Sequence, residues 1–264
     1  MHPSLRIAVE AAHQAGKLIV QKFQRVDLLT ISQKAHSDFV TEVDQAAEQL
    51  IIQRLKKSFP THAFLAEESG ETRGKDDEYV WIIDPLDGTT NFIHGFPHFA
   101  VSIALQHKGK LEQAVIYDPI RHEFFTASRG HGALLNDRKM RVSNRVKLED
   151  TLLGLGFPFR NPEKLAEHLA IFTRLFPITG NMRRAGSAAL DMAYVASGRL
   201  DGYWEGGVMP WDIAAGVLLV QEAGGMVSDY NGSDHYLKTN SIITGNPKIF
   251  KALLEHIQAS LLVR

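Results

Sequence analysis

Two aspartates three residues apart, Asp84 and Asp87, lie in the stretch WIIDPLDGTTN at positions 81–91. A short apolar run ends immediately before Asp84, so both carboxylates are expected at the end of a buried strand. Two ionised carboxylates side by side in such a place are costly unless a cation neutralises them. The pair therefore indicates a divalent-metal site.

The residues that follow Asp87 are suited to binding an anion. Gly88 lets the backbone approach a ligand closely, and Thr89 and Thr90 can begin a helix whose unpaired N–H groups face a phosphate. A simpler interpretation is a capped strand-to-helix turn in which Asp84 and Asp87 only hold backbone amides. The stretch alone is equally compatible with both interpretations, so other motifs must decide.

Two further acids, Glu67 and Asp212, also lie where predicted strands or helices meet loops. With a backbone carbonyl, four carboxylates would supply all-oxygen ligands, which suit Mg2+ rather than zinc. Asp212 has an alternative role, because a negative charge in the first turn of a helix is stabilised by the helix dipole. Two metal ions about 4 Å apart would activate water and stabilise the leaving oxygen in an in-line phosphate displacement. A hydroxyl–carboxylate pair, such as Thr89 with a distant aspartate, could orient that water.

Other catalytic signatures are absent from the sequence. HExxH, GxSxG, Walker A and GxGxxG motifs do not occur, which disfavours a zinc hydrolase, a serine hydrolase and nucleotide-driven transfer. The 264 residues are 44% hydrophobic and 22% charged, carry a net charge of −1 and include no cysteine. These values exclude disulfides and give no general attraction to nucleic acid or membranes. With no signal pattern or membrane-length apolar run, a cytoplasmic protein is expected.

Hydrophobic periodicity predicts the elements that position these residues. Polar or turn-rich loops are expected at 33–38, 71–78 and 130–136, and the strand before Asp84 should stop at Pro85. The mixed order of elements predicts a layered α/β or α+β architecture. Helices are expected over 3–24, from about 45 to 59, and over 162–176, 187–198, 211–223 and 247–262; strands are expected near 63–65, 80–83, 99–107, 111–118, 122–127, 152–156, 200–204, 226–229 and 242–244.

Four motifs in this order resemble the inositol monophosphatase family, specifically its bacterial branch. They are AEESG (66–70), WIIDPLDGTTNF (81–92), RRAGSAALDMAYVASGRLDGYWE (183–205) and PWDIAAGVLLVQEAGG (210–225), and DFVTEVDQAAE (38–48) accompanies them. The resemblance implies a five-layer α-β-α-β-α sandwich, assembled as a homodimer. We treat residues 1–264 as one domain, with a half at 1–145 that carries the metal and phosphate motifs and a substrate-side half at 146–264.

The resemblance also implies a metal-ligand set. Glu67, Asp84 and the carbonyl of Leu86 would bind the first Mg2+, Asp87 would bridge two ions, and Asp212 would complete the second site. A third, weaker Mg2+ would contact Glu67 through water, which gives two or three ions per active site. Lithium would inhibit by occupying one of these positions.

The same resemblance assigns catalytic and substrate contacts. Thr89, held by Asp44, is similar to the family's water-activating pair, and Gly88, Thr89 and Thr90 match its phosphate cradle. Arg183 and Arg184 are interpreted as surface or subunit-interface salt bridges rather than substrate contacts. The residues that match the family's contacts to substrate hydroxyls are Asp87, Gly186, Ser187, Ala188, Glu205 and Asp212.

The substrate that this resemblance favours is inositol 1-phosphate or a related polyol or sugar phosphomonoester. Thr90-Asn91 follows the Asp-Gly-Thr motif, where sister families for other phosphate esters place a lysine or arginine. Relatives with the same DGTTN motif also hydrolyse fructose 1,6-bisphosphate, so that activity is the nearest alternative. A third hypothesis comes from similar bacterial proteins that act as accessory factors in transcription antitermination, bound to RNA polymerase components. The near-neutral charge means that such a role would depend on protein contacts.

Overall fold

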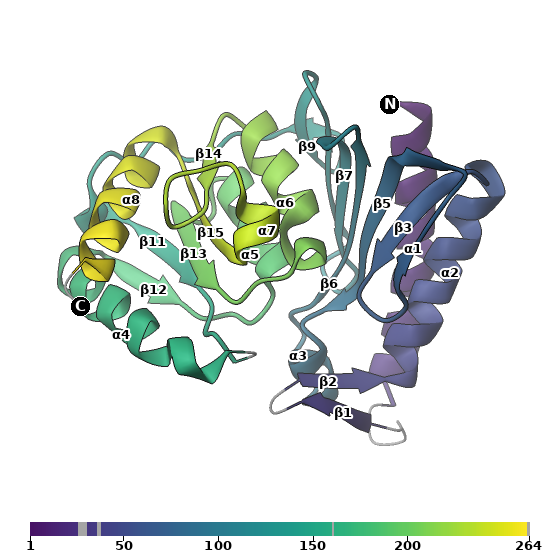
Figure 1. Cartoon of the computed structure of the whole chain (residues 1–264), viewed down its shortest axis with the longest axis horizontal. Coiled ribbons are helices and arrows are strands. Elements are labelled where there is room, and N and C mark those ends of the chain that lie inside the picture. The colour runs from purple at the N-terminus through teal and green to yellow at the C-terminus, as the bar shows by residue number, and fades with distance from the viewer. Residues whose placement is uncertain (26–30, 36–37, 160, 263–264) are drawn as a thin grey trace.

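The computed structural model describes residues 1–25, 31–35, 38–159 and 161–262. It has five layers, in which helices alternate with two β-sheets (Figure 1). Helices α1 and α2 cover one face of the first sheet, α5 and α6 lie between the sheets, and α4 and α8 cover the far face of the second sheet. The layered α/β fold predicted from the sequence is therefore confirmed. The helices are α1 (Pro3–Phe23), α2 (Glu42–Ser58), α3 (Thr89–Ile93), α4 (Leu165–Leu175), α5 (Ala188–Ala196), α6 (Pro210–Glu222), α7 (Tyr236–Thr239) and α8 (Pro247–Leu261).

The first sheet has eight strands in the order β10-β9-β8-β7-β6-β5-β3-β4. All neighbours are antiparallel except β3 and β5, which are parallel and pair Ala66 with Ile83. Parallel pairing brings the carboxyl ends of these two strands to one edge. The strands are β3 (His62–Ala66), β4 (Gly70–Thr72), β5 (Asp76–Asp87), β6 (Ala100–His107), β7 (Lys110–Asp118), β8 (Glu123–Ser128), β9 (Gly132–Leu135) and β10 (Arg138–Lys139).

The second sheet has five strands in the order β12-β11-β13-β15-β14. Strand β11 is parallel to both of its neighbours, whereas β15 is antiparallel to β13 and β14. A separate hairpin, β1 (Ile31–Ala35) with β2 (Asp38–Thr41), precedes α2. The strands of the second sheet are β11 (Leu152–Leu155), β12 (Asn181–Arg183), β13 (Gly202–Gly206), β14 (Met226–Ser228) and β15 (Ser241–Gly245).

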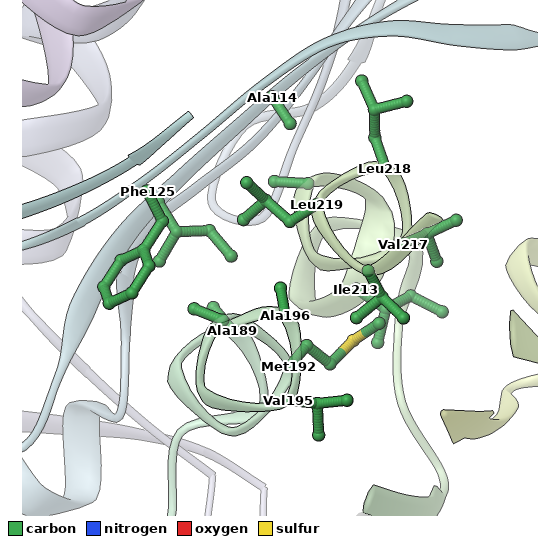
Figure 2. Packing of buried hydrophobic residues seen from close by; sticks show 14 of the residues in the cluster. Ala114, Phe125, Ala189, Met192, Val195, Ala196, Ile213, Val217, Leu218 and Leu219 are labelled. Atoms are coloured by element: carbon green, nitrogen blue, oxygen red, sulfur yellow. The ribbon is translucent and has the colours of Figure 1, made fainter. Parts of the chain in front are cut away.

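The middle layer is buried on both sides because its helices consist almost wholly of small and apolar residues. Every residue of α6 from Asp212 to Val220 is buried, and α5 presents alanines and Met192 to it. Figure 2 shows Met192 of α5 beside Ile213 of α6, with Phe125 of the first sheet closing the cluster. A Cβ at Gly216 would lie 2.6 Å from Met192 Cβ, so a glycine is required for the two helices to pack this closely. This packing holds α5 and α6 against each other between the two sheets.

The predicted helices and most predicted strands are confirmed, but three predicted loops are wrong. Residues 33–38 fall in the β1–β2 hairpin apart from two positions outside the described residues, 71–78 contribute to β4 and β5, and 130–136 contain β9. Backbone pairing with neighbouring strands supports these segments, which are too short or too polar for hydrophobic alternation to reveal. Strand β5 also continues past Pro85 to Asp87, although its pairing with β6 is interrupted between Asp84 and Asp87. Among the described residues, no helix combines the length and apolar character needed to cross a bilayer.

Candidate active site

Glu67 and Asp84 lie side by side at one edge of the first sheet. Each follows a member of the Ala66–Ile83 pair, the last pair between the parallel strands β3 and β5. The Glu67 N–H donates to the carbonyl of Ile83 at 3.1 Å, so the pairing continues for one residue beyond β3. Chain topology therefore brings together two acids that are separated by 17 positions in the sequence.

Asp84 is a buried carboxyl surrounded by other acids. It is 2% exposed, and its Oδ1 accepts a hydrogen bond from the Leu86 N–H at 2.9 Å. Burial raises its pKa well above the usual range, and the charges of Glu67, Asp87 and Asp212 raise it further. Several negative charges thus converge here on one buried group.

Asp87 connects the first sheet to the middle layer. Its Oδ2 accepts hydrogen bonds from Ser187 Oγ at 2.6 Å and from the Ala189 N–H at 2.7 Å. Ser187 is the N-cap of α5, and its Oγ also accepts from the Leu190 N–H at 3.2 Å. The α5 N-terminus is therefore docked on a carboxylate one hundred residues earlier in the chain.

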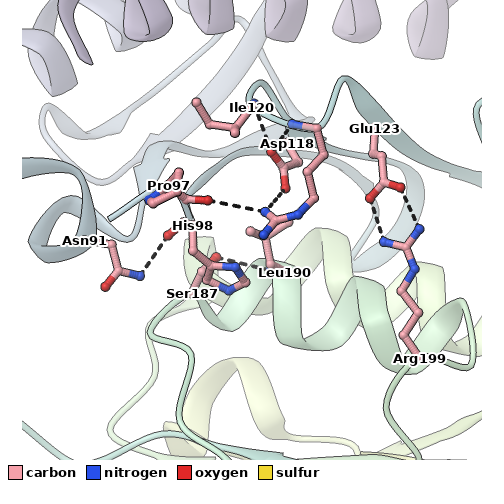
Figure 3. Close-up of polar contacts among 10 residues, drawn as sticks. Asn91, Pro97, His98, Asp118, Ile120, Glu123, Ser187, Leu190 and Arg199 are labelled. Atoms are coloured by element: carbon pink, nitrogen blue, oxygen red, sulfur yellow. Dashed lines mark hydrogen bonds and ion pairs between the residues drawn. The ribbon is translucent and has the colours of Figure 1, made fainter. Parts of the chain in front are cut away.

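The turn after Asp87 is fixed by close backbone contacts. Gly88 has a φ of 101°, and a Cβ there would lie 3.0 Å from the carbonyl oxygen of His98. Helix α3 begins at Thr89, and the Asn91 side-chain amide donates to the carbonyls of His98 at 2.8 Å and Ala185 at 2.9 Å. Figure 3 shows the Asn91–His98 contact beside the start of α5. These bonds place Thr89 and Thr90 at the mouth of a cavity that reaches Gly186.

Thr89, which is half-buried, and the buried Asp44 form a hydroxyl–carboxylate pair. Thr89 Oγ lies 2.9 Å from Asp44 Oδ1 and 3.1 Å from the carbonyl of Leu86, so its proton can be donated to either oxygen. Asp44 Oδ2 accepts from the N–H of Thr41 at 2.8 Å and its hydroxyl at 2.6 Å, as part of the capping box of α2. Burial raises the pKa of Asp44, and the hydrogen bonds from Thr41 and Thr89 partly offset that rise.

Asp212 belongs to the first turn of α6. Its Oδ2 accepts from the Met209 N–H at 2.7 Å, and it is 4% exposed. The Ser102 hydroxyl donates to the carbonyl of Trp211 at 3.3 Å, which fixes this turn against β6. Asp212 can be stabilised by the helix dipole and also bind a metal ion. One of its carboxylate oxygens caps α6, while the side chain lines the cavity.

Glu205 lies on the opposite wall, on β13. Its carboxylate accepts a hydrogen bond from the Tyr203 hydroxyl, and a Cβ at Gly156 would overlap it, so glycine leaves the space that it fills. Burial raises the pKa of Glu205 to about 7, with smaller contributions from the charges of Asp212 and Asp87. The hydrogen bond from Tyr203 opposes this rise.

The raised pKa of Glu205 predicts a pH-dependent stability in the metal-free protein. Between the ordinary value of 4.5 and about 7, the folded chain keeps a proton that the unfolded chain has lost, so stability falls as pH rises through this window. Glu205→Gln is expected to remove that loss. Each tenfold difference in proton affinity between the folded and unfolded chains corresponds to about 1.4 kcal/mol, or roughly 2–4 °C in Tm.

Thermal unfolding with chelator at pH 5 and pH 8 checks this prediction. The Tm of the variant minus that of wild type should be larger at pH 8, and exposed Glu255→Gln should show no such change.

The sequence analysis missed Asp191 and assigned Arg184 to the surface. Asp191 is 2% exposed, its Oδ1 has no hydrogen-bond partner, and burial followed by the charges of Glu205 and Asp87 raises its pKa well above the usual range. Arg184 lines the same cavity, stacks 4.8 Å from the centre of the Phe159 ring, and lowers the pKa of both Asp191 and Glu205. An available signal for Asp191 was its position as the lone charged residue in AALDMAYVA.

A cavity of about 130 Å³ collects nearly all of the residues selected from the sequence. Asp44 does not line the cavity, but it is hydrogen-bonded to Thr89, which does. The selected residues that line it are Glu67, Asp84, Leu86, Asp87, Gly88, Thr89, Thr90, Gly186, Ser187, Ala188, Glu205 and Asp212.

The donor set of this cavity fits a hard divalent cation. Its ligating groups are carboxylates, hydroxyls and carbonyls, which are Mg2+ ligands. The neighbouring acids that help to raise the pKa of Asp84 are the negative charge that a cation would neutralise. Within the described residues, no three acidic or histidine side chains already meet the geometric requirement for holding an ion. Asp84, Asp87 and Asp212 each give an oxygen to a protein donor, so ion binding would have to draw the carboxylates together.

Comparison with known proteins agrees with this geometry. The family model described as "Inositol monophosphatase family" matches residues 1–262. A Pseudomonas aeruginosa protein named "Nus factor SuhB" is 56% identical over 99% of this chain and 98% of its own length. The structure of a Bartonella henselae extragenic suppressor protein suhB is 44% identical, with a TM-score of 0.93 and coverage of 96% of this chain and 97% of that one. An inositol monophosphatase from Anabaena is 40% identical, with a TM-score of 0.87 and coverage of 97% and 95%. This chain therefore belongs to the inositol monophosphatase family.

Proposed function

We propose that this protein is a Mg2+-dependent phosphatase that hydrolyses inositol 1-phosphate and related polyol or sugar phosphomonoesters to the free alcohol and phosphate. The observation that carries the proposal is a single cavity that combines the acids of the β3–β5 edge, the turn at Gly88 and the N-terminus of α6. In this proposal Glu67, Asp84, Asp87, Asp212 and the Leu86 carbonyl would hold the ions. When bound, Mg2+ would stabilise charge on the phosphate oxygens and lower the pKa of water.

The residues of the chain itself would orient the attacking water. If Thr89 donates its proton to Asp44, the Thr89 oxygen keeps lone pairs that can accept a hydrogen bond from water in the cavity. The raised pKa of Asp44 makes its carboxylate a stronger base, which suits it to accept a proton from Thr89. Phosphate oxygens would be held by the backbone of Gly88, Thr89 and Thr90.

The wall opposite the metal ligands would select the alcohol. Glu205 can accept hydrogen bonds from substrate hydroxyls, and Ser187, which is bonded to Asp87, lines the same cavity. A polyol presents several hydroxyls to such a wall, whereas a bulky anionic extension would meet the carboxyl oxygens of Glu205 and Asp87. The Anabaena relative's name supports the inositol ester as the first substrate to test.

The test is release of phosphate from inositol 1-phosphate, with and without Mg2+, by wild type and Asp212→Asn. An asparagine oxygen can retain the hydrogen bond from the Met209 N–H, so the variant should fold but lose a metal-binding charge. We expect Mg2+-dependent turnover in wild type and a loss of at least about tenfold in the variant, which corresponds to about 1.4 kcal/mol in the barrier. Exposed Asp234→Asn serves as the matched control. Preference for fructose 1,6-bisphosphate, run in parallel, would transfer the substrate assignment to that ester.

A second candidate function is supported by the name of the Pseudomonas aeruginosa relative, "Nus factor SuhB". In this role the chain would join a transcription complex through protein contacts. Pull-down of RNA polymerase and elongation factors by wild type and Asp212→Asn separates the two roles. Equal capture by both proteins would support a partner role independent of hydrolysis, whereas no capture alongside normal turnover would leave the enzyme role alone.

A further inference from the structure

Helix α2 carries two buried carboxylates one turn apart, Asp44 and Glu48, which are 1% and 3% exposed. Residues four apart lie on one face of a helix, so both point towards the edge where β3 and β5 end. Asp44 holds Thr89. Glu48 has no part in the site described above.

Glu48 binds the loop that carries Glu67. Its Oε2 accepts from the Glu68 N–H at 2.8 Å, and its Oε1 accepts from the Ser69 N–H at 2.9 Å. One carboxylate thus engages two consecutive amides directly after Glu67, while the Glu67 N–H itself is bound to the carbonyl of Ile83 at 3.1 Å. The backbone is anchored on both sides of the Glu67 side chain.

We propose that Glu48 is a positioning residue that fixes the loop of Glu67 and thereby sets the affinity of the cavity for a divalent cation. This inference rests on the proposed function. Charged acceptors make stronger hydrogen bonds than neutral ones, and groups that orient metal ligands commonly change metal affinity 10–100-fold when altered. Helix α2 then supports both sides of the site, through Asp44 for the water-orienting pair and through Glu48 for the metal-ligand loop.

Glu48→Gln tests the role because it keeps the shape of the side chain. Its amide oxygen can accept from one of the two N–H groups, but its NH2 group faces the other as donor against donor. In calorimetric titration with Mg2+ alone, without substrate, the variant is expected to bind 10–100-fold more weakly than wild type. Glu42→Gln is the matched control, since Glu42 belongs to the same helix, is exposed and pairs with Lys22. Its affinity should stay within about twofold of wild type.

A role limited to loop stability would lower the Tm of Glu48→Gln and leave its Mg2+ affinity unchanged, and that result would overturn the proposal. If the variant does not fold, hydrogen exchange of wild type decides. The amides of Glu68 and Ser69 should be protected relative to that of Gly109 in the β6–β7 turn, and equal exchange would overturn the proposal. Because the titration contains no substrate, a wild type that binds Mg2+ but releases no phosphate would refute the proposed function alone.

Discussion

Asp87→Asn is expected to reduce Mg2+-dependent phosphate release on the order of a thousandfold while leaving the fold intact. The asparagine oxygen can take the place of Oδ2 and accept from both Ser187 and Ala189, so the docking of α5 survives. The amide nitrogen that replaces the other oxygen donates and cannot ligate a cation. If Asp87 bridges two ions as proposed, its loss would remove about 4 kcal/mol of charge stabilisation, since each 1.36 kcal/mol is tenfold in rate. Steady-state phosphate release gives the loss, and circular dichroism confirms the fold.

Ser187→Ala is the control for this variant. It removes one hydrogen bond to Asp87 but keeps the carboxylate, so activity should fall far less than in Asp87→Asn. Retention of more than about a tenth of the wild-type rate by Asp87→Asn would contradict a bridging role, because the barrier would then have changed by less than about 1.4 kcal/mol.

Asp84→Asn is expected to move stability and activity in opposite directions. The asparagine oxygen can keep the hydrogen bond from the Leu86 N–H, and the substitution removes a charge that is buried near Glu67, Asp87 and Asp212. An acid whose pKa is raised by folding destabilises the folded state increasingly as pH rises above its ordinary value of 3.8. The metal-free variant should therefore have a higher Tm than metal-free wild type at pH 8, yet show little turnover.

Mg2+ should reverse that order. An ion that binds only the folded chain stabilises it by about 2.7 kcal/mol at one hundred times its Kd, so wild type should gain Tm on adding Mg2+. Asp84→Asn should gain much less, and Asp234→Asn should behave as wild type. A variant that is less stable than wild type in chelator, or that keeps the full response to Mg2+, would show that Asp84 is a structural residue and not a ligand.

The sequence predicts the helices well because their apolar spacing and caps are local features. Ser187, proposed as the N-cap of the 187–198 helix, caps α5. The strands that escaped prediction, such as β9 and β4, are only four and three residues long, and pairing with the preceding strand of a hairpin holds each in place. Local composition resembles that of a loop in both cases.

The residues of the candidate site also fall into those that the sequence indicates and those that only the folded structure reveals. Asp84 and Asp87 were visible because they lie three residues apart, and Glu67 and Asp212 because they fall where predicted elements meet loops. The motifs shared with a known family indicated Asp44. Glu48 and Asp191 were missed, since nothing near Glu48 in sequence shows that it binds amides 20 and 21 positions later. Arg184, interpreted as a surface residue, is exposed yet lines the cavity. Such roles arise only from tertiary packing.

The docking of α5 on Asp87 has a consequence for synthesis of the chain on the ribosome. The donors at Ser187 and Ala189, and the Trp211 carbonyl that binds Ser102, leave the ribosome long after the first sheet. Until then the nascent chain carries an uncovered apolar sheet face and an acidic edge that lacks Asp212. Domains fold during synthesis from the N-terminus, and exposed apolar surface promotes aggregation. A chain that terminates before α6 therefore lacks a complete site and is prone to aggregate. The site can form only once the polypeptide has been synthesised as far as α6.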